Sequence, residues 1–196
     1  MPNWCNNSLT IKSDNYGQLL QYRNACLSNE PNLLEMIRPF TEETNYEWDY
    51  DWCVDNWGTK WDVHDVMSCY LIEGELTIVF DTAWSPPVEA LQHGAKRHGF
   101  TFELEYYEPG MMYAGFATED RDDLYEYTFN VHPCEELPDH IVDAFSIDRD
   151  YDYWLQEMDD GDVQNLSDDQ KEYRKMLFLF TSVDRTLLRT LSFWHC

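Results

Sequence analysis

Residues 75–106, ELTIVFDTAWSPPVEALQHGAKRHGFTFELEY, hold a strand, a helix and a second strand in direct succession. Apolar and polar residues alternate from 75 to 82 and again from 102 to 106, as in strands that bury one face. The residues between them repeat their apolar positions at helical spacing, through Val88, Leu91 and Ala95. This stretch therefore predicts a β-α-β unit, and the rest of the fold is built around it.

The ends of the predicted helix carry residue types that start and stop helices. We expect Ser85 to cap its N-terminus and Pro86 to occupy the first helical position, where a missing N–H does no harm. Arg97 and His98 suit the negative C-terminal end, and Gly99 can end the helix in a left-handed conformation.

A second, similar unit precedes this one in the chain. Residues 6–13 alternate as a strand, residues 16–27 show helical spacing, and residues 66–73 form a further strand that turns at Glu73-Gly74 into residue 75. The order β-α-β-β-α-β is that of a ferredoxin-like sandwich, in which a four-stranded antiparallel sheet carries two helices on one face. The sequence thus predicts an α+β protein of this type.

Three segments fall outside this pattern. Residues 31–62 are dense in tryptophan and acidic residues, and we expect an irregular insertion packed on the core. Residues 112–129 predict an extra hairpin around residues 119–122. We therefore divide the chain into a ferredoxin-like domain, 1–130, and an acidic helical C-terminal extension, 131–196.

The extension is expected to alternate short helices with an acidic loop. Residues 138–145 have helical spacing, and an acidic loop is predicted at residues 159–162. Ser167 and Gln170 form a capping box that predicts a further helix, and Ser182 is expected to cap a last short one.

Four short motifs follow one another in the first two thirds of the chain. They are MPNWCNN at 1–7, NWGTKWD at 56–62, FDTAWSPP at 80–87 and YEPG at 107–110. Together they resemble the YubB-like family of ferredoxin-like proteins carried by phages and plasmids, over about residues 1–130. The resemblance implies a ferredoxin-like fold, an origin in a mobile element and no settled biochemical activity. Small acidic proteins of such elements often counter host defences.

The motif residues have two interpretations, which the sequence leaves open. Their tryptophans can form a structural seam that fixes the insertion to the sheet. Alternatively, Lys60, Trp61, Trp84 and Glu108 line a recognition pocket. Lys60 is the only lysine or arginine between Glu42 and Asp65, so an internal ion pair would explain it equally well.

Charge restricts the classes of partner. The chain has 38 acidic and 13 basic residues, a formal net charge of −25. Binding to the phosphate backbone of nucleic acids needs a surplus of lysine and arginine, so direct nucleic-acid binding is not expected, nor is binding to anionic membranes. No secretory signal opens the chain, no apolar run is long enough to span a membrane, and the six cysteines form no CxxC pair. We therefore expect a cytoplasmic protein with reduced thiols.

The acidic residues are most concentrated between 119 and 172. This segment has nineteen acidic residues and only three basic ones, Arg121, Arg149 and Lys171. Carboxylates displayed at high density on a folded scaffold can occupy a basic nucleic-acid channel. This predicts a protein that binds and inhibits a basic host protein, such as a nucleic-acid-processing defence factor. The alternative is that the acids only maintain solubility, with the basic C-terminal end docked onto them. The residues expected to contact the partner are Asp148, Asp150, Asp152, Asp159, Asp160 and Asp162.

Metal and catalytic sites are not predicted. Asp148, Asp150 and Asp152 match positions 1, 3 and 5 of a calcium-binding loop, but Tyr153 stands where the loop needs glycine. No zinc-ligand spacing, P-loop or nucleophile motif is present. We therefore expect neither a cofactor nor an enzyme. The alternative is a small-ligand or enzymatic domain that uses the pocket near Lys60, Trp84 and Glu108.

Overall fold

The computed structural model describes residues 3–162, with side chains as far as Gln156. Contacts divide the chain into two compact units, Met1–Arg149 and Asp150–Cys196. The sequence analysis placed the boundary after residue 130 instead. The predicted helices that begin at Ser167 and Ser182 lie outside the described residues.

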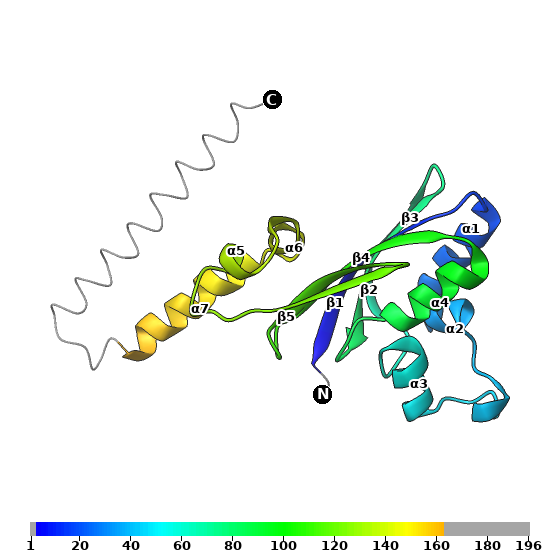
Figure 1. Ribbon diagram of the computed structural model, residues 1–196, viewed down its shortest axis with the longest axis horizontal. Coiled ribbons are helices and arrows are strands. Elements are labelled where there is room, and N and C mark those ends of the chain that lie inside the picture. The colour runs from blue at the N-terminus through cyan, green and yellow to red at the C-terminus, as the bar shows by residue number, and fades with distance from the viewer. Residues whose placement is uncertain (1–2, 163–196) are drawn as a thin grey trace. The chain divides into compact units, whose positions relative to one another are not determined.

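The first unit is built on one antiparallel sheet with the strand order β2-β3-β1-β4-β5-β6 (Figure 1). The first four strands of this order are the ferredoxin-like arrangement, and the hairpin β5-β6 extends it beyond β4. The α+β, ferredoxin-like fold is confirmed. The strands are β1 Trp4–Lys12, β2 His64–Ile72, β3 Glu75–Ala83, β4 Thr101–Glu108, β5 Tyr113–Thr118 and β6 Arg121–Glu126.

Two helices, α1 (Tyr16–Cys26) and α4 (Val88–His98), lie on the same face of this sheet (Figure 1). The predicted inward face of α4 is buried, and Gly99 ends the helix at φ 73°. The expected cap of α4 was wrong. The helix begins at Val88 after Pro87, and the Ser85 hydroxyl donates to the Gly58 carbonyl instead. A residue before proline avoids the helical region, and the two consecutive prolines therefore delay the start.

The insertion contains regular structure that the sequence analysis missed. It forms α2 (Leu33–Ile37), the 3₁₀ turn η1 (Glu42–Thr44) and α3 (Tyr50–Trp57). The Asp49 carboxylate caps α3 by accepting from the Trp52 amide at 2.8 Å, and Gly58 ends it at φ 83°. Trp52, Trp57 and Phe40 pack together against the main core. The expectation that the insertion packs on the core is confirmed.

The opposite face of the sheet is covered near β4 and β5. There α6 (Asp139–Phe145), which follows the short helix α5 (Pro133–Glu136), forms a second apolar cluster with the strands. Its buried members are Tyr107, Ala114, Tyr127, Leu137, Ile141, Val142 and Ile147. The part of the chain after residue 130 thus shares a core with the sheet as far as Ile147.

The last described element is α7, Ile147–Asp162. The predicted acidic loop at 159–162 was wrong, because these residues continue the helix. Asp148 and Asp150 lie at the positive N-terminal end of α7, where carboxylates are favourable. Further along the helix the rings of Tyr151 and Trp154 stack, with 6.1 Å between their centroids. None of the helices within residues 3–162 is both long and apolar enough to cross a bilayer.

Candidate functional site

Three aromatic rings surround the ammonium group of Lys60. Its Nζ atom lies 4.3 Å from the ring centroid of Trp61, 4.9 Å from that of Trp84 and 5.8 Å from that of Tyr50. Distances within about 6 Å are those of cation–π attraction. We call Tyr50, Trp61 and Trp84 the aromatic cage; their exposed fractions are 42%, 36% and 40%.

Two further tryptophans extend the cage into a larger aromatic surface. The Trp48 indole donates to the Lys60 carbonyl at 3.2 Å, and about half of this side chain is exposed. Trp4, at the start of β1, lies 6.4 Å from Trp61 between ring centroids. The aromatic surface, defined as the cage with Trp4 and Trp48, therefore joins β1, the insertion and the end of β3.

Two hydroxyl groups, those of Thr59 and Ser85, hold the loop that carries Lys60. Thr59 is fully buried and donates to the Ala83 carbonyl at 2.9 Å. The Ser85 hydroxyl donates to the carbonyl of Gly58, the residue before Thr59. Ala83 and Ser85 of the FDTAWSPP motif thus hold the NWGTKWD motif in place. These contacts support the structural interpretation of both motifs.

Trp84 occupies a strained backbone position that the surrounding residues stabilise. Its φ is 72°, a left-handed conformation that costs a residue with a side chain about 1–2 kcal/mol. The Trp84 amide donates to the Asn3 carbonyl at 2.9 Å, and the Tyr113 hydroxyl donates to the Trp84 carbonyl. Non-glycine residues in this region gather at functional sites, so the strain favours a role for the exposed indole.

A buried polar network supports this strained turn. The Asn7 amide group donates to Thr82 Oγ1 at 2.9 Å, and the Thr82 hydroxyl donates to the Ser85 carbonyl at 2.8 Å. Asn7 and Thr82 are both fully buried. Because each lost hydrogen bond would leave a buried polar group unpaired, the network makes the turn rigid.

Three of the four predicted pocket residues come together and one does not. Lys60, Trp61 and Trp84 meet in the cage, whereas Glu108 is fully buried and its carboxylate accepts from the Gly110 and Met111 amides. Glu108 therefore closes the turn of the YEPG motif. Burial, and after it the charge of Glu108, raises the pKa of the Cys5 thiol.

The ammonium group of Lys60 contacts aromatic rings and forms no ion pair with another described residue. Among the described residues, no carboxylate lies within 4.0 Å of its Nζ atom. Acidic residues are nevertheless abundant in the same segment, and Glu47, Asp49, Asp51 and Asp55 are all exposed. The aromatic surface thus lies in a part of the chain with one lysine and many carboxylates.

The carboxylates predicted to bind the partner lie on α7. Asp148, Asp150 and Asp152 occupy its first turns, so the calcium-loop pattern falls on a helix and does not form a loop. Asp159, Asp160 and Asp162 lie in its last turns, and their side chains are outside the described part. Within the described residues, no group of three His, Cys, Asp or Glu side chains is placed to hold a metal ion.

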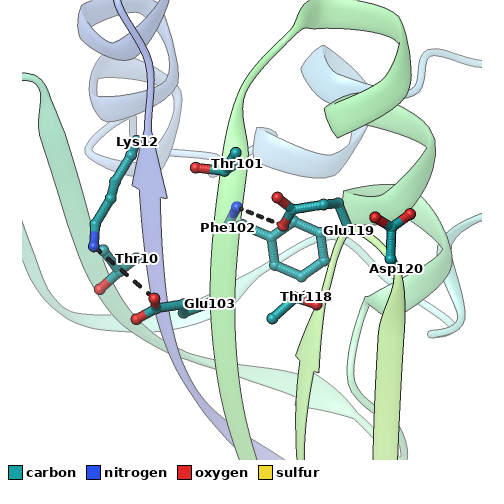
Figure 2. A pocket seen from close by; sticks show the side chains of 8 residues that line it. All are labelled: Thr10, Lys12, Thr101, Phe102, Glu103, Thr118, Glu119 and Asp120. Atoms are coloured by element: carbon teal, nitrogen blue, oxygen red, sulfur yellow. Dashed lines mark hydrogen bonds and ion pairs between the residues drawn. The ribbon is translucent and has the colours of Figure 1, made fainter.

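A shallow hollow of about 300 Å³ lies at the other end of β1 (Figure 2). Lys12 crosses it towards Glu103 on β4, at 3.9 Å, and also pairs with Glu75 at 3.6 Å. The Glu119 carboxylate accepts from the Phe102 amide at 3.4 Å. The one lysine of the hollow is thus already paired with carboxylates, and the aromatic surface remains the stronger candidate.

Sequence reasoning missed Trp4, Trp48 and Tyr50 as members of this site. Trp4 is part of the first motif, and its position there was the one available signal. Trp48 and Tyr50 lie among alternating aromatic and acidic residues, a pattern that does not show which rings pack inward. Trp52 and Trp57, from the same segment, are buried.

Comparison with protein families finds a match for the middle of the chain. A family model described as a ferredoxin-like domain in Api92-like protein matches residues 56–132. Searches of curated proteins and of solved structures returned no match. The chain is thus similar to the ferredoxin-like domain of Api92-like proteins over a range that contains Lys60, Trp61 and Trp84.

Proposed function

We propose that this chain is an accessory protein of a phage or plasmid that binds and inhibits a basic protein in the host cytoplasm. The partner that fits this proposal best is a nucleic-acid-processing defence factor, whose basic channel the acidic protein would occupy. The observation that carries the proposal is the rigid, exposed aromatic surface around Lys60 in a strongly acidic part of the molecule.

Exposed aromatic side chains favour protein binding. Tryptophan and tyrosine are enriched among the residues that dominate binding energy, because each buries a large area at a small cost in conformational entropy. Trp48, Trp61 and Trp84 are all partly exposed, and all three lie around Lys60. Their fixed positions lower the entropy lost on association.

The acidic residues favour a basic partner. Glu47, Asp49, Asp51 and Asp55 are exposed beside the aromatic residues in the insertion, and the net charge of −25 acts at longer range. Such charge accelerates association with a basic surface and disfavours acidic ones. In this proposal the carboxylates provide steering and selectivity, and the aromatic rings provide most of the affinity.

The same geometry favours binding over catalysis. Lys60 fills the aromatic cage, and the hollow in the described residues lies at the opposite end of β1. The proposal therefore assigns no reaction to the site and treats Lys60 as the residue that holds the rings in place.

The test is capture of a partner from host cells by the full chain. We compare the wild type with the double variant Trp61→Ala, Trp84→Ala, and use Leu124→Ala as a control, because Leu124 is exposed on β6 and outside the aromatic surface. The expected result is a basic protein captured by the wild type and by the control but not by the double variant.

Two outcomes would contradict parts of the proposal. If the wild type captures no basic protein, the proposed function is wrong. If the double variant, with an unchanged circular dichroism spectrum, captures the same protein equally well, the site is wrong. With the purified partner, excess wild type should displace its nucleic acid at low salt, and high salt should slow association because the charges are screened.

A further inference from the structure

The strand β2 is an unprotected edge of the sheet. It stands first in the strand order and pairs with β3 on one side. Three large apolar side chains of this strand are strongly exposed: Met67 at 60%, Tyr70 at 61% and Ile72 at 66%. Within the described residues, no strand pairs with its outer side. An edge of this kind offers backbone N–H and C=O groups to another extended chain.

The opposite edge of the sheet is protected. Strand β6 carries Arg121, Asp122, Asp123 and Glu126 among its six residues. Charged side chains on an edge strand are a common defence against unwanted pairing, because like charges repel when two edges meet. The two edges of one sheet thus differ sharply in the same molecule, and only β2 is suited to pairing.

The part of β2 available for pairing is short and uncharged. Its register with β3 is irregular between His64 and Ser68, and regular from Ser68 to Ile72. A bulge twists an edge strand and ends regular pairing. The remaining segment, SCYLI at 68–72, has no ionisable acid or base apart from the Cys69 thiol and the Tyr70 hydroxyl.

We propose that β2 pairs with β2 of a second copy of this chain, antiparallel and about a two-fold axis at Tyr70. In this register Tyr70 faces the partner's Tyr70, and Ile72 faces the partner's Ser68. Aromatic pairs directly across two strands are favourable, and a two-fold interface needs such a self-complementary patch. The two sheets then become one continuous sheet.

The composition of the segment 68–72, and not the charge of the whole chain, favours a second copy over a basic peptide. The segment 68–72 offers no carboxylate that would attract lysine or arginine. Because the paired residues 68–72 include no carboxylate, no two carboxylates oppose each other in the proposed register. The net charge of −25 on each copy still opposes association, and added salt therefore strengthens the dimer.

Sedimentation equilibrium of the full chain tests this inference, independently of the proposed function. We expect a monomer–dimer equilibrium that shifts towards the dimer between about 0.1 M and about 0.5 M salt. Tyr70→Lys should raise the dissociation constant at least about tenfold. The control Leu124→Lys places the same charge on the exposed face of β6 and should leave the constant unchanged.

Hydrogen exchange gives a second readout that does not depend on a variant. The amides of residues 68–72 that point outward should become more protected as the protein concentration rises. A chain that remains monomeric at all concentrations and salts would overturn the inference. So would an equal weakening by Leu124→Lys and Tyr70→Lys in variants with unchanged thermal midpoints.

Discussion

The Oδ1 atom of Asp62 accepts a hydrogen bond from the Leu34 amide at 2.9 Å, across 28 positions of sequence. Its Oδ2 atom accepts from the Glu35 amide at 2.8 Å, so the carboxylate caps the first turn of α2. Burial nevertheless raises the pKa of Asp62 from 3.8 to about 6, against the opposing effect of the amide hydrogen bonds. The two ends of the insertion are thus joined by a carboxylate that titrates in the mildly acidic range.

This pKa predicts a specific pH dependence of stability. A carboxyl group with a raised pKa in the folded state binds its proton more tightly there than in the unfolded state. Its contribution to the free energy of unfolding is therefore largest below about pH 4 and is lost as the pH rises through about 6. The difference amounts to roughly 3 kcal/mol for a shift of about two units.

Urea unfolding of the wild type and Asp62→Asn, between about pH 4 and about pH 7, measures this contribution. Asparagine does not titrate, so the stability of the wild type minus that of the variant should fall as the pH rises. A difference that stays constant, or that grows with pH, would show that the raised pKa is wrong.

The buried hydroxyl of Thr59 should contribute to the stability of the whole domain. Thr59→Val keeps the shape but removes the donor to the Ala83 carbonyl, and we expect a loss of about 1–3 kcal/mol in the free energy of unfolding. Thr77→Val is the matched control, because Thr77 lies partly exposed on β3 and its hydroxyl is 3.5 Å from that of Thr10. An equal effect of the two variants in urea unfolding would argue against the role of the Thr59 hydroxyl.

Gly115 permits a close contact inside the sheet. A Cβ atom there would overlap the Tyr106 ring and lie 2.5 Å from the Asp123 carbonyl, so Gly115→Ala should cost at least about 2 kcal/mol. Gly17→Ala, in α1, meets nothing closer than 3.4 Å and should be neutral or slightly stabilising. Thermal unfolding of both variants provides the comparison. A Gly115→Ala variant as stable as the wild type would contradict the tight packing.

The cation–π contacts of Lys60 should also be measurable. Lys60→Met keeps an unbranched side chain but removes the charge, and we expect a loss of about 1 kcal/mol in unfolding free energy. Tryptophan fluorescence should change in the same variant, because two of the contacting rings are indoles. Lys96→Met, on the exposed last turn of α4, controls for the loss of one positive charge. Similar values for the two lysine variants would mean that the rings do not stabilise the charge.

Local sequence signals were sufficient to predict the strands of the sheet but not the helices of the insertion. The alternation in β3 and β4, and the spacing of Val88, Leu91 and Ala95 in α4, reflect burial of one face and are visible in the sequence alone. The cap of α2 is provided by Asp62, far away in the chain, so no local pattern indicates where that helix begins. Tertiary contacts decide such elements, and residues 31–62 therefore looked irregular.

The candidate site shows the same division. Lys60, Trp61 and Trp84 lie in recognisable motifs, and one of the two interpretations of these motifs placed them together; in the structure both rings contact Lys60. Glu108 is also in a motif, but its side chain points into the turn of residues 108–111, a direction that depends on the backbone there. The motifs identify which residues matter and do not separate those that hold the structure from those that face the solvent.

Because the cage is assembled from segments far apart in the chain, the surface that it forms is a discontinuous epitope. Tyr50, Lys60 and Trp61 come from the insertion, whereas Trp84 follows β3 and is tied to Asn3 beside β1. A synthetic peptide that copies the insertion lacks one wall of the cage. Recognition through this surface should therefore be lost at the same denaturant concentration as the sheet itself, and a binder selected against it should discriminate native from unfolded chains.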